Sequence, residues 1–232
     1  MDQYLFDKEL DCPVCVNHFV TKKPRLRKLP VDKKDSDFHI WYKEINPVHY
    51  NVWVCPNCGF SATESEFKKL TTDEKTAVLK NVSLKWNKRD FGGIRTTEMA
   101  FETHKLALII AQLLNKSKGY LGGLCLRLAW LYRERENAEQ ETIYLNYALE
   151  HLEDAYTHES FPIAGLDEVS LSYLIGELKR KTGEPQNAIF WFGRALDHPD
   201  IKFKRIIQLK AREQWQLARD AYKKQKEQRI NE

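Results

Sequence analysis

The segment NVWVCPNCGF, residues 51–60, decides the fold of the N-terminal part of the chain. It carries Cys55 and Cys58, which are separated by two residues and followed directly by Gly59. A C-x-x-C turn places two thiolates about 3.5–4 Å apart, the edge length that a tetrahedral zinc site needs. A single pair of this kind also suits a redox dithiol, so its meaning depends on the rest of the sequence.

A second pair, Cys12 and Cys15 in CPVC, lies upstream. Two such turns predict one tetrahedral Zn²⁺ site, whose ligands are Cys12, Cys15, Cys55 and Cys58. The spacer, residues 16–54, exceeds the roughly 15–20 residues of a compact zinc ribbon, so extra strands or a long loop are expected. A redox dithiol and a site for iron or another soft metal are the alternatives. Four thiolates leave no open position for water, so a catalytic zinc is not expected.

The other candidate metal ligands are expected to be structural. His18, His39 and His49 lie in predicted strands or loops, where a histidine is more often structural than a ligand. Cys125 lies in LCLRLAW on an apolar helix face and is expected to be a small buried hydrophobe.

Composition indicates a globular protein without a membrane segment. The chain has 232 residues, 42% hydrophobic and 30% charged, which fits one large or two modest domains. Its start, MDQYLFDKEL, has no basic and apolar signal-peptide pattern, and the longest apolar run, LALIIAQLL at 106–114, is about half a membrane span. We therefore expect a cytoplasmic protein.

The sequence predicts an α+β chain in two parts. Residues 1–90 are expected to form a β-rich, zinc-ribbon-like module, and residues 91–232 an all-helical domain, with a linker around Gly92-Gly93. Strands are predicted within 18–30, 37–45 and 48–55. Short helices are predicted from Ser61, where Ser-x-x-Glu is a capping-box pattern, and over 72–81 after Thr71. Longer helices are predicted over 96–116, 120–135, 139–157, 167–181, 186–197 and 201–228.

The stretch LSYLIGELKRKTGEPQNAIFWFGRALDHPD, residues 171–200, resembles a tetratricopeptide (TPR) helix pair. Gly176 and Ala188 stand where two helices approach closely, and Phe192 is expected to fill the gap between them. Two departures from the motif are Lys179, where an aromatic is usual, and Pro199, one residue early. A looser match lies 47 residues upstream, beyond the 34-residue step of a true tandem repeat, so the domain is called TPR-like.

TPR-like arrays bind partners along an inner face formed by the first helix of each pair. By the motif's register, the groove positions of this chain are Trp130, Arg133, Tyr173, Glu177 and Arg180. The last helix carries an apolar stripe and a basic opposite face, and we expect it to cap the array. The stripe comprises Ile206, Leu209, Trp215, Leu217 and Tyr222.

The two parts together resemble a bacterial family of zinc-knuckle proteins of unknown function. The matching stretches are CPVCVNHF, NPVHYNVWVCPNCGFSA, RTTEMAF with HKLAL, RLAWLYRE and YLIGELKRKTG. The resemblance implies the metal and the TPR-like helical domain, and it implies no activity.

The favoured function is a non-enzymatic zinc-binding adaptor that docks a protein or peptide partner in its helical groove. No nucleophile elbow, phosphate loop or H-E-x-x-H motif is present, so no catalytic residue is predicted. The alternative is a nucleic-acid-binding zinc ribbon, in which Phe38, Trp41 and Tyr42 would stack on bases. Its phosphate contacts would be Lys22, Lys23, Arg25, Arg27 and Lys28. Against it, residues 133–168 are strongly acidic and would repel phosphate.

Overall fold

The computed structural model describes the backbone of residues 3–231 and the side chains of residues 3–228. The chain forms two compact units. The first comprises the residues up to Lys34, Ile40–Lys116 and Trp130–Asn137. The second comprises Asp35–His39, Ser117–Ala129 and the residues from Ala138 onward. This division differs from the boundary that the sequence suggested near residue 90.

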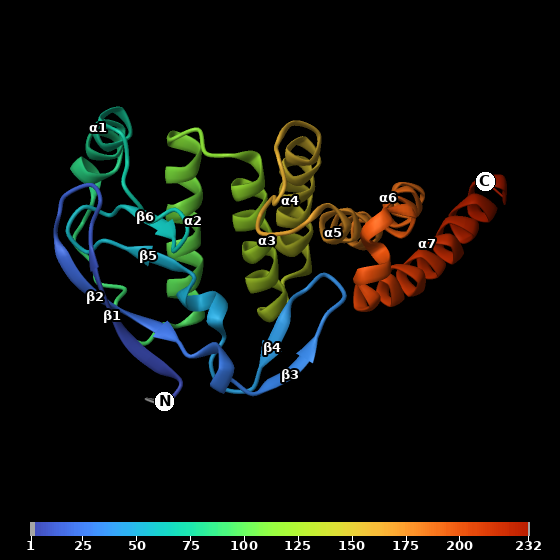
Figure 1. Cartoon of the computed structure of the whole chain (residues 1–232), viewed down its shortest axis with the longest axis horizontal. Helices are drawn as coiled ribbons and strands as arrows, with labels where there is room; N and C mark the ends of the chain where they lie inside the picture. Colours follow the sequence, from blue (N-terminus) through green and yellow to red (C-terminus); the bar gives the residue numbers. More distant parts are fainter. Residues whose placement is uncertain (1–2, 232) are drawn as a thin grey trace. The chain divides into compact units, whose positions relative to one another are not determined.

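The strands of the first unit form three separate two-stranded antiparallel sheets (Figure 1). In two of them the turn between the strands is a cysteine knuckle, because Asp11 pairs with His18 and Val54 pairs with Ser61. The three pairs are β1 (Leu5–Asp11) with β2 (His18–Pro24), β3 (Val31–Lys34) with β4 (Ile40–Tyr42), and β5 (Val52–Val54) with β6 (Ser61–Thr63). Single-turn 3₁₀ helices at Leu26–Lys28 and Pro47–Tyr50 separate the three pairs along the chain, and a third 3₁₀ turn, Ser83–Lys85, follows the last pair.

The helix predicted from Ser61 is wrong, because residues 61–63 form strand β6. The Ser61 hydroxyl donates to the carbonyl oxygen of Gly59 at 2.9 Å and caps no helix. The strand predicted over Val48–Cys55 is also shorter than expected, since residues 47–50 form a 3₁₀ helix. Its remaining residues, Val52, Trp53 and Val54, are all buried, so the strand has no solvent-exposed face.

Two helices complete the first unit. Helix α1 (Thr72–Asn81) begins as predicted: the Thr71 hydroxyl accepts a hydrogen bond from the Glu74 backbone, and the Glu74 carboxylate accepts one from the Thr71 backbone. Helix α2 (Thr97–Leu113) packs against β5 and β6, which is why it belongs to this unit. Ala107, Ile110 and Ala111 of α2 are buried, whereas Ile109 is 57% exposed.

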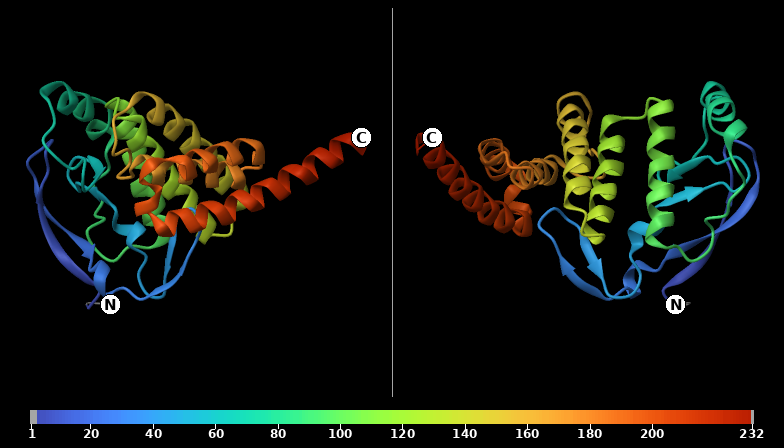
Figure 2. Two further views of the ribbon diagram at one scale, coloured as in Figure 1. Left: turned by 45° about the vertical axis from the view of Figure 1, so that its right-hand side comes forward. Right: turned by 180° about the vertical axis from the view of Figure 1, so that it is seen from behind.

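The second unit is helical apart from the loop Asp35–His39 (Figures 1 and 2). Its helices are α3 (Lys118–Glu134, of which residues 130–134 belong to the first unit), α4 (Ala138–His158), α5 (Glu168–Lys181), α6 (Pro185–Asp197) and α7 (Arg205–Asn231), with a 3₁₀ turn at Pro199–Phe203. The α+β fold class is therefore confirmed. No helix within the described residues is long and apolar enough to cross a membrane.

Helices α5 and α6 pack through the residues that the sequence singled out. A β-carbon at Gly176 would lie 2.8 Å from the ring of Phe192, so only glycine allows this approach. Phe192, Ala188 and Ala195 are completely buried at the same contact. Helix α5 starts at Asp167, whose carboxylate accepts a hydrogen bond from the Ser170 backbone at 2.9 Å.

Helix α7 buries only part of the predicted stripe: Trp215 packs against the core cluster that holds Phe192, and Tyr222 is partly buried. Ile206, Leu209 and Leu217 are 73%, 57% and 48% exposed. The buried positions among the described side chains of α7 are Ala211, Gln214 and Ala218, and the small side chains of the two alanines let α7 pack closely in the cluster that holds Phe192. The C-terminal part of α7 extends past α5 and α6 in both views of Figure 2.

Candidate metal centre

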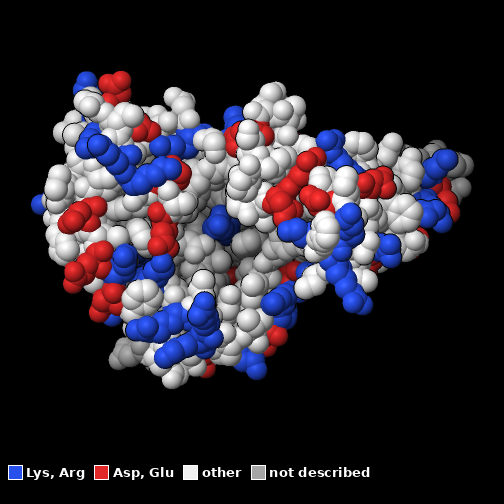
Figure 3. Space-filling view, in the orientation of Figure 1, with Lys and Arg blue, Asp and Glu red and all other residues white. Residues whose placement is uncertain are grey.

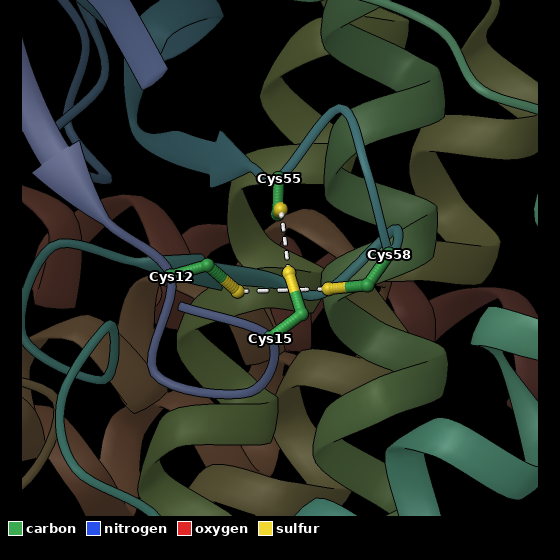
Figure 4. Close-up of side chains that lie close together, drawn as sticks. All are labelled: Cys12, Cys15, Cys55 and Cys58. Carbon is green, nitrogen blue, oxygen red and sulfur yellow. Dashed lines mark hydrogen bonds between the residues drawn. The ribbon is translucent and has the colours of Figure 1, made fainter. Parts of the chain in front are cut away.

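The four cysteines of the two knuckles meet in one cluster of the first unit (Figure 4). The sulfur atoms of Cys12 and Cys58 are 3.5 Å apart, and those of Cys15 and Cys55 are 3.6 Å apart. All four sulfurs lie within 4.8 Å of one another. A tetrahedral zinc ion with Zn–S bonds of about 2.3 Å needs sulfur–sulfur edges of about 3.8 Å. The cluster can therefore hold a tetrahedral metal ion after small adjustments.

Each knuckle is a backbone turn that points its sulfurs inward. In the first, the Val16 amide donates to the Cys12 carbonyl oxygen at 2.9 Å, and in the second the Gly59 amide donates to the Cys55 carbonyl oxygen at 2.9 Å. Val16 and Gly59 hold the same position after the second cysteine, and both have positive φ, at 60° and 75°. The turn therefore needs a left-handed residue at this position, which glycine supplies and valine adopts under strain.

Two further groups fix the second knuckle in place. The indole nitrogen of Trp86 donates to the carbonyl oxygen of Pro56 at 3.0 Å, and the ring of Trp86 covers Gly59 so closely that a β-carbon there would lie 2.5 Å away. The hydroxyl of Ser83 donates to the carbonyl oxygen of Cys58 at 2.9 Å. The segment that follows α1 thus packs over the second knuckle and holds its backbone in place.

The sulfurs influence one another's ionisation. The neighbouring Cys55 raises the pKa of Cys12 to about 12, and hydrogen bonds from Cys12 and Cys58 lower the pKa of Cys55 to about 2. The sulfur of Cys12 also raises the pKa of Cys58. One thiolate is therefore stabilised by its neighbours, whereas several together repel one another. A bound divalent cation supplies the charge that four thiolates in this space require.

The surroundings of the cluster are apolar, which suits a structural site. Cys12, Cys55 and Cys58 are buried, and Cys15 is partly exposed. The sulfurs belong to a core cluster with Phe19, Phe60 and Val78. The Asn57 side-chain amide donates to the Cys15 sulfur at 3.6 Å.

The remaining candidate ligands lie elsewhere. His18 pairs with Asp11 at 2.9 Å on the surface, and His49 lies 3.5 Å from Glu134. His39 is fully buried in the second unit, 3.5 Å from Asp35. Cys125 is buried as expected, and burial raises the pKa of its thiol to about 12.

Three of the predicted groove residues lie together on α5, but their side chains are not freely accessible to solvent. Tyr173 and Glu177 are completely buried, and Arg180 is half-buried and donates two hydrogen bonds to the Glu177 carboxylate, at 2.8 and 2.9 Å. Burial, with Glu177 nearby, raises the pKa of Tyr173. The loop Asp35–His39, between β3 and β4 and termed the hairpin tip below, contacts this part of α5. Trp130 and Arg133 belong to the first unit and are not part of this cluster.

The sequence did not identify the hairpin tip as the segment that contacts the groove. Phe38, considered a base-stacking candidate, packs on Tyr173 with ring centroids 5.4 Å apart. The only signal in the sequence was complementary charge, since Asp35 and Asp37 match a stretch of α5 that ends in Lys179-Arg180-Lys181.

The basic residues of the nucleic-acid alternative are partly neutralised. Lys22 pairs with Asp7 at 2.7 Å and Lys23 with Glu64 at 2.6 Å. The guanidinium of Arg25 lies 4.9 Å from the centre of the Phe6 ring, and Arg27 and Lys28 are exposed on a 3₁₀ turn. On the face shown in Figure 3, one group of basic side chains lies together near the lower edge, and elsewhere acidic and basic side chains are interspersed.

Comparison with known families places residues 5–218 in the family described as "Uncharacterized protein conserved in bacteria (DUF2225)". The chain belongs to this family. It is also similar to an uncharacterized protein of Borreliella burgdorferi, strain ATCC 35210, with 26% identity over 213 residues, covering 84% of this chain and 71% of that protein. No solved structure matches the chain at a significant level.

Proposed function

We propose that the protein is a non-enzymatic, cytoplasmic zinc-binding adaptor. In this proposal the four-cysteine centre stabilises the first unit, and the TPR-like helices α5–α7 dock a protein or peptide partner. The observation that carries it is the seating of a peptide segment, the hairpin tip, on the predicted groove positions Tyr173 and Glu177.

The metal's role in this proposal is structural. Zn²⁺, when bound, would join two hairpin turns that lie far apart in the sequence and so replace part of the hydrophobic core that small β sheets lack. Cys12, Cys15, Cys55 and Cys58 would occupy all four positions of a tetrahedral ion, so no position would remain for a substrate or water. We therefore propose no catalytic residue.

The TPR-like interpretation rests on the packing of α5 and α6. The close approach at Gly176, filled by Phe192 and flanked by Ala188, is the contact that the resemblance implied. Such helix pairs are interaction scaffolds, and partner binding is the function that this packing supports best.

Affinity purification of the tagged protein from its native cells tests the adaptor. The wild type is compared with Arg180→Ala, which removes a groove cation, and with Lys202→Ala, which removes an exposed cation outside the groove. We expect a protein partner that survives nuclease treatment, is lost with Arg180→Ala and is kept with Lys202→Ala. Equal recovery of the partner with both variants contradicts partner binding at the predicted groove. Loss of the partner on nuclease treatment favours the nucleic-acid alternative.

A further inference from the structure

Helix α5 contacts the hydroxyl and the carbonyl oxygen of Ser36 in the hairpin tip. The Ser36 hydroxyl donates to the Glu177 carboxylate at 2.5 Å, and the Tyr173 hydroxyl donates to the Ser36 carbonyl oxygen at 2.7 Å. Arg180 holds the Glu177 carboxylate in place through its two hydrogen bonds. A fixed donor and a fixed acceptor thus recognise one residue of an irregular peptide segment.

Charged and aromatic contacts surround this pair of hydrogen bonds. The carboxylate of Asp37 is completely buried and lies 3.9 Å from the ammonium of Lys181. Lys210 of α7 donates to the carbonyl oxygen of Asp35 at 3.3 Å and lies 6.0 Å from the centre of the Phe38 ring. That ring packs on Tyr173, which in turn contacts Phe192 at 5.8 Å between ring centroids. The two ammonium groups and the Tyr173 ring are therefore chemically complementary to a turn that carries carboxylates and an aromatic side chain.

The tip is attached to the rest of the chain by a minimal sheet. Among the strands that the structure describes, β3 and β4 pair only with each other, and all four residues of β3 are exposed. An isolated two-stranded hairpin is marginally stable in water, so the position of the tip depends on its contacts with α5 and α7. Phe38 also has a φ of 71°, a conformation that costs free energy and needs such contacts to persist.

We propose that the groove formed by Tyr173, Glu177, Lys181 and Lys210 is a recognition site for an acidic, aromatic peptide turn, and that the hairpin tip occupies it in cis. A partner peptide of the same chemistry must then displace the tip before it can bind. This inference rests on the proposed adaptor function and names both its ligand class and its internal competitor. Because a tethered competitor acts at an effective concentration in the millimolar range, by order of magnitude, the wild type would bind such a peptide at least tenfold more weakly than an open groove.

The test removes the tip and supplies it as a free peptide. In the loop-shortened full-length variant, Asn-Gly replaces Asp35–His39; Lys34 and Ile40 are already paired across the hairpin, and Asn-Gly is the preferred two-residue hairpin turn. The probe is a fluorescein-labelled peptide of residues 33–41, KKDSDFHIW, titrated by anisotropy. A second peptide with alanine in place of Phe38 is the matched control for the aromatic contact.

We expect the loop-shortened variant to bind the peptide at least tenfold more tightly than the wild type does. Adding Tyr173→Phe to this variant, which removes only the hydroxyl that contacts Ser36, should weaken binding about tenfold. Equal binding by wild type and variant overturns the competition. Absence of binding by a variant with a native far-UV circular dichroism spectrum overturns the recognition site.

A second pair of variants keeps the proposal testable if the shortened loop does not fold. Ser36→Asp places a carboxylate against that of Glu177, whereas Ser36→Ala removes only the hydroxyl. Hydrogen exchange of residues 35–41 should rise strongly for Ser36→Asp and little for Ser36→Ala, and unchanged exchange in Ser36→Asp contradicts a displaceable tip. A failure of the proposed adaptor function gives a different pair of results. The labelled peptide still binds more tightly to the loop-shortened variant than to the wild type, but affinity purification with Arg180→Ala recovers the same cellular proteins as the wild type.

Discussion

The ring of Phe192 lies only 2.8 Å from the position that a β-carbon at Gly176 would take, so the missing side chain at residue 176 sets the distance between α5 and α6. Phe192 is completely buried, Gly176 is buried as well, and the contact belongs to the core of the second unit. The packing of this helix pair is therefore sensitive to a single methyl group.

Gly176→Ala should lower the free energy of unfolding by about 1–3 kcal/mol, because a methyl group forced into a packed core shifts the Phe192 ring or the helix. Urea titration followed by circular dichroism measures it. Gly193→Ala on α6 is the matched control, since a β-carbon there meets nothing within 4 Å. It should raise stability by about 0.5–1 kcal/mol through helix propensity. Destabilisation by both variants to the same extent would contradict the packing explanation.

Freshly purified protein should contain about one zinc ion per chain, since the sulfurs of one cluster fit one tetrahedral ion. Cys58→Ser should lose the metal and destabilise the first unit, because three thiolates hold zinc weakly and the joined turns separate. Metal analysis by mass spectrometry together with thermal unfolding measures both effects. Cys125→Ala, which removes a buried thiol outside the cluster, should keep the metal. Iron instead of zinc, or no metal in the wild type, would refute the zinc assignment.

Val16→Gly should stabilise the first knuckle, because Val16 is 76% exposed and holds a φ of 60° at the position that Gly59 occupies in the second knuckle. The left-handed conformation costs an L-residue about 1–2 kcal/mol, and the larger chain entropy of glycine offsets about 0.5–1 kcal/mol of the gain. A net rise of about 0.5–1 kcal/mol in the free energy of unfolding is expected in urea titration. Val16→Ala keeps the β-carbon and should change little. A loss of stability in Val16→Gly would show that the valine side chain makes a contact of its own.

Features that depend on neighbouring residues were predictable from the sequence. The capping box of Thr71 and Glu74 fixed the start of α1, and the C-x-x-C spacing identified the four cysteines that meet in the cluster. Periodicity placed the long helices within a few residues of their observed ends.

Features that depend on distant partners and leave no motif in the sequence were not predictable. Ser61 matches a capping box locally, but pairing with Val54 makes it a strand residue. The hairpin tip meets residues far along the chain, since Ser36 and Glu177 are 141 positions apart. No local pattern records such a contact, and a basic neighbourhood with Phe38, Trp41 and Tyr42 therefore suggested nucleic acid instead.

The stability of the first unit should fall in acid partly through Glu74. The ammonium of Lys116 donates to its carboxylate at 2.7 Å, and the Thr71 backbone donates to the other oxygen at 2.8 Å. Lys116, followed by the Thr71 backbone, lowers the pKa of Glu74 below 4.5. A carboxylate with a lowered folded-state pKa stabilises the fold above its unfolded pKa, and this stabilisation is lost as the pH falls through the folded pKa.

Glu74→Gln separates the charge of this residue from its capping role, because a glutamine oxygen still accepts the Thr71 hydrogen bond. The variant should be about 0.5–1 kcal/mol less stable than the wild type at pH 7, and the difference should shrink as the pH falls through the lowered folded-state pKa of the wild-type carboxylate. Urea titrations between pH 3 and pH 7 measure this. Glu102→Gln, which breaks the exposed pair with Arg89, should cost little at any pH, because both partners are about half exposed. A pH-independent deficit in Glu74→Gln would show that the carboxylate acts through its shape and hydrogen bonds rather than through its charge.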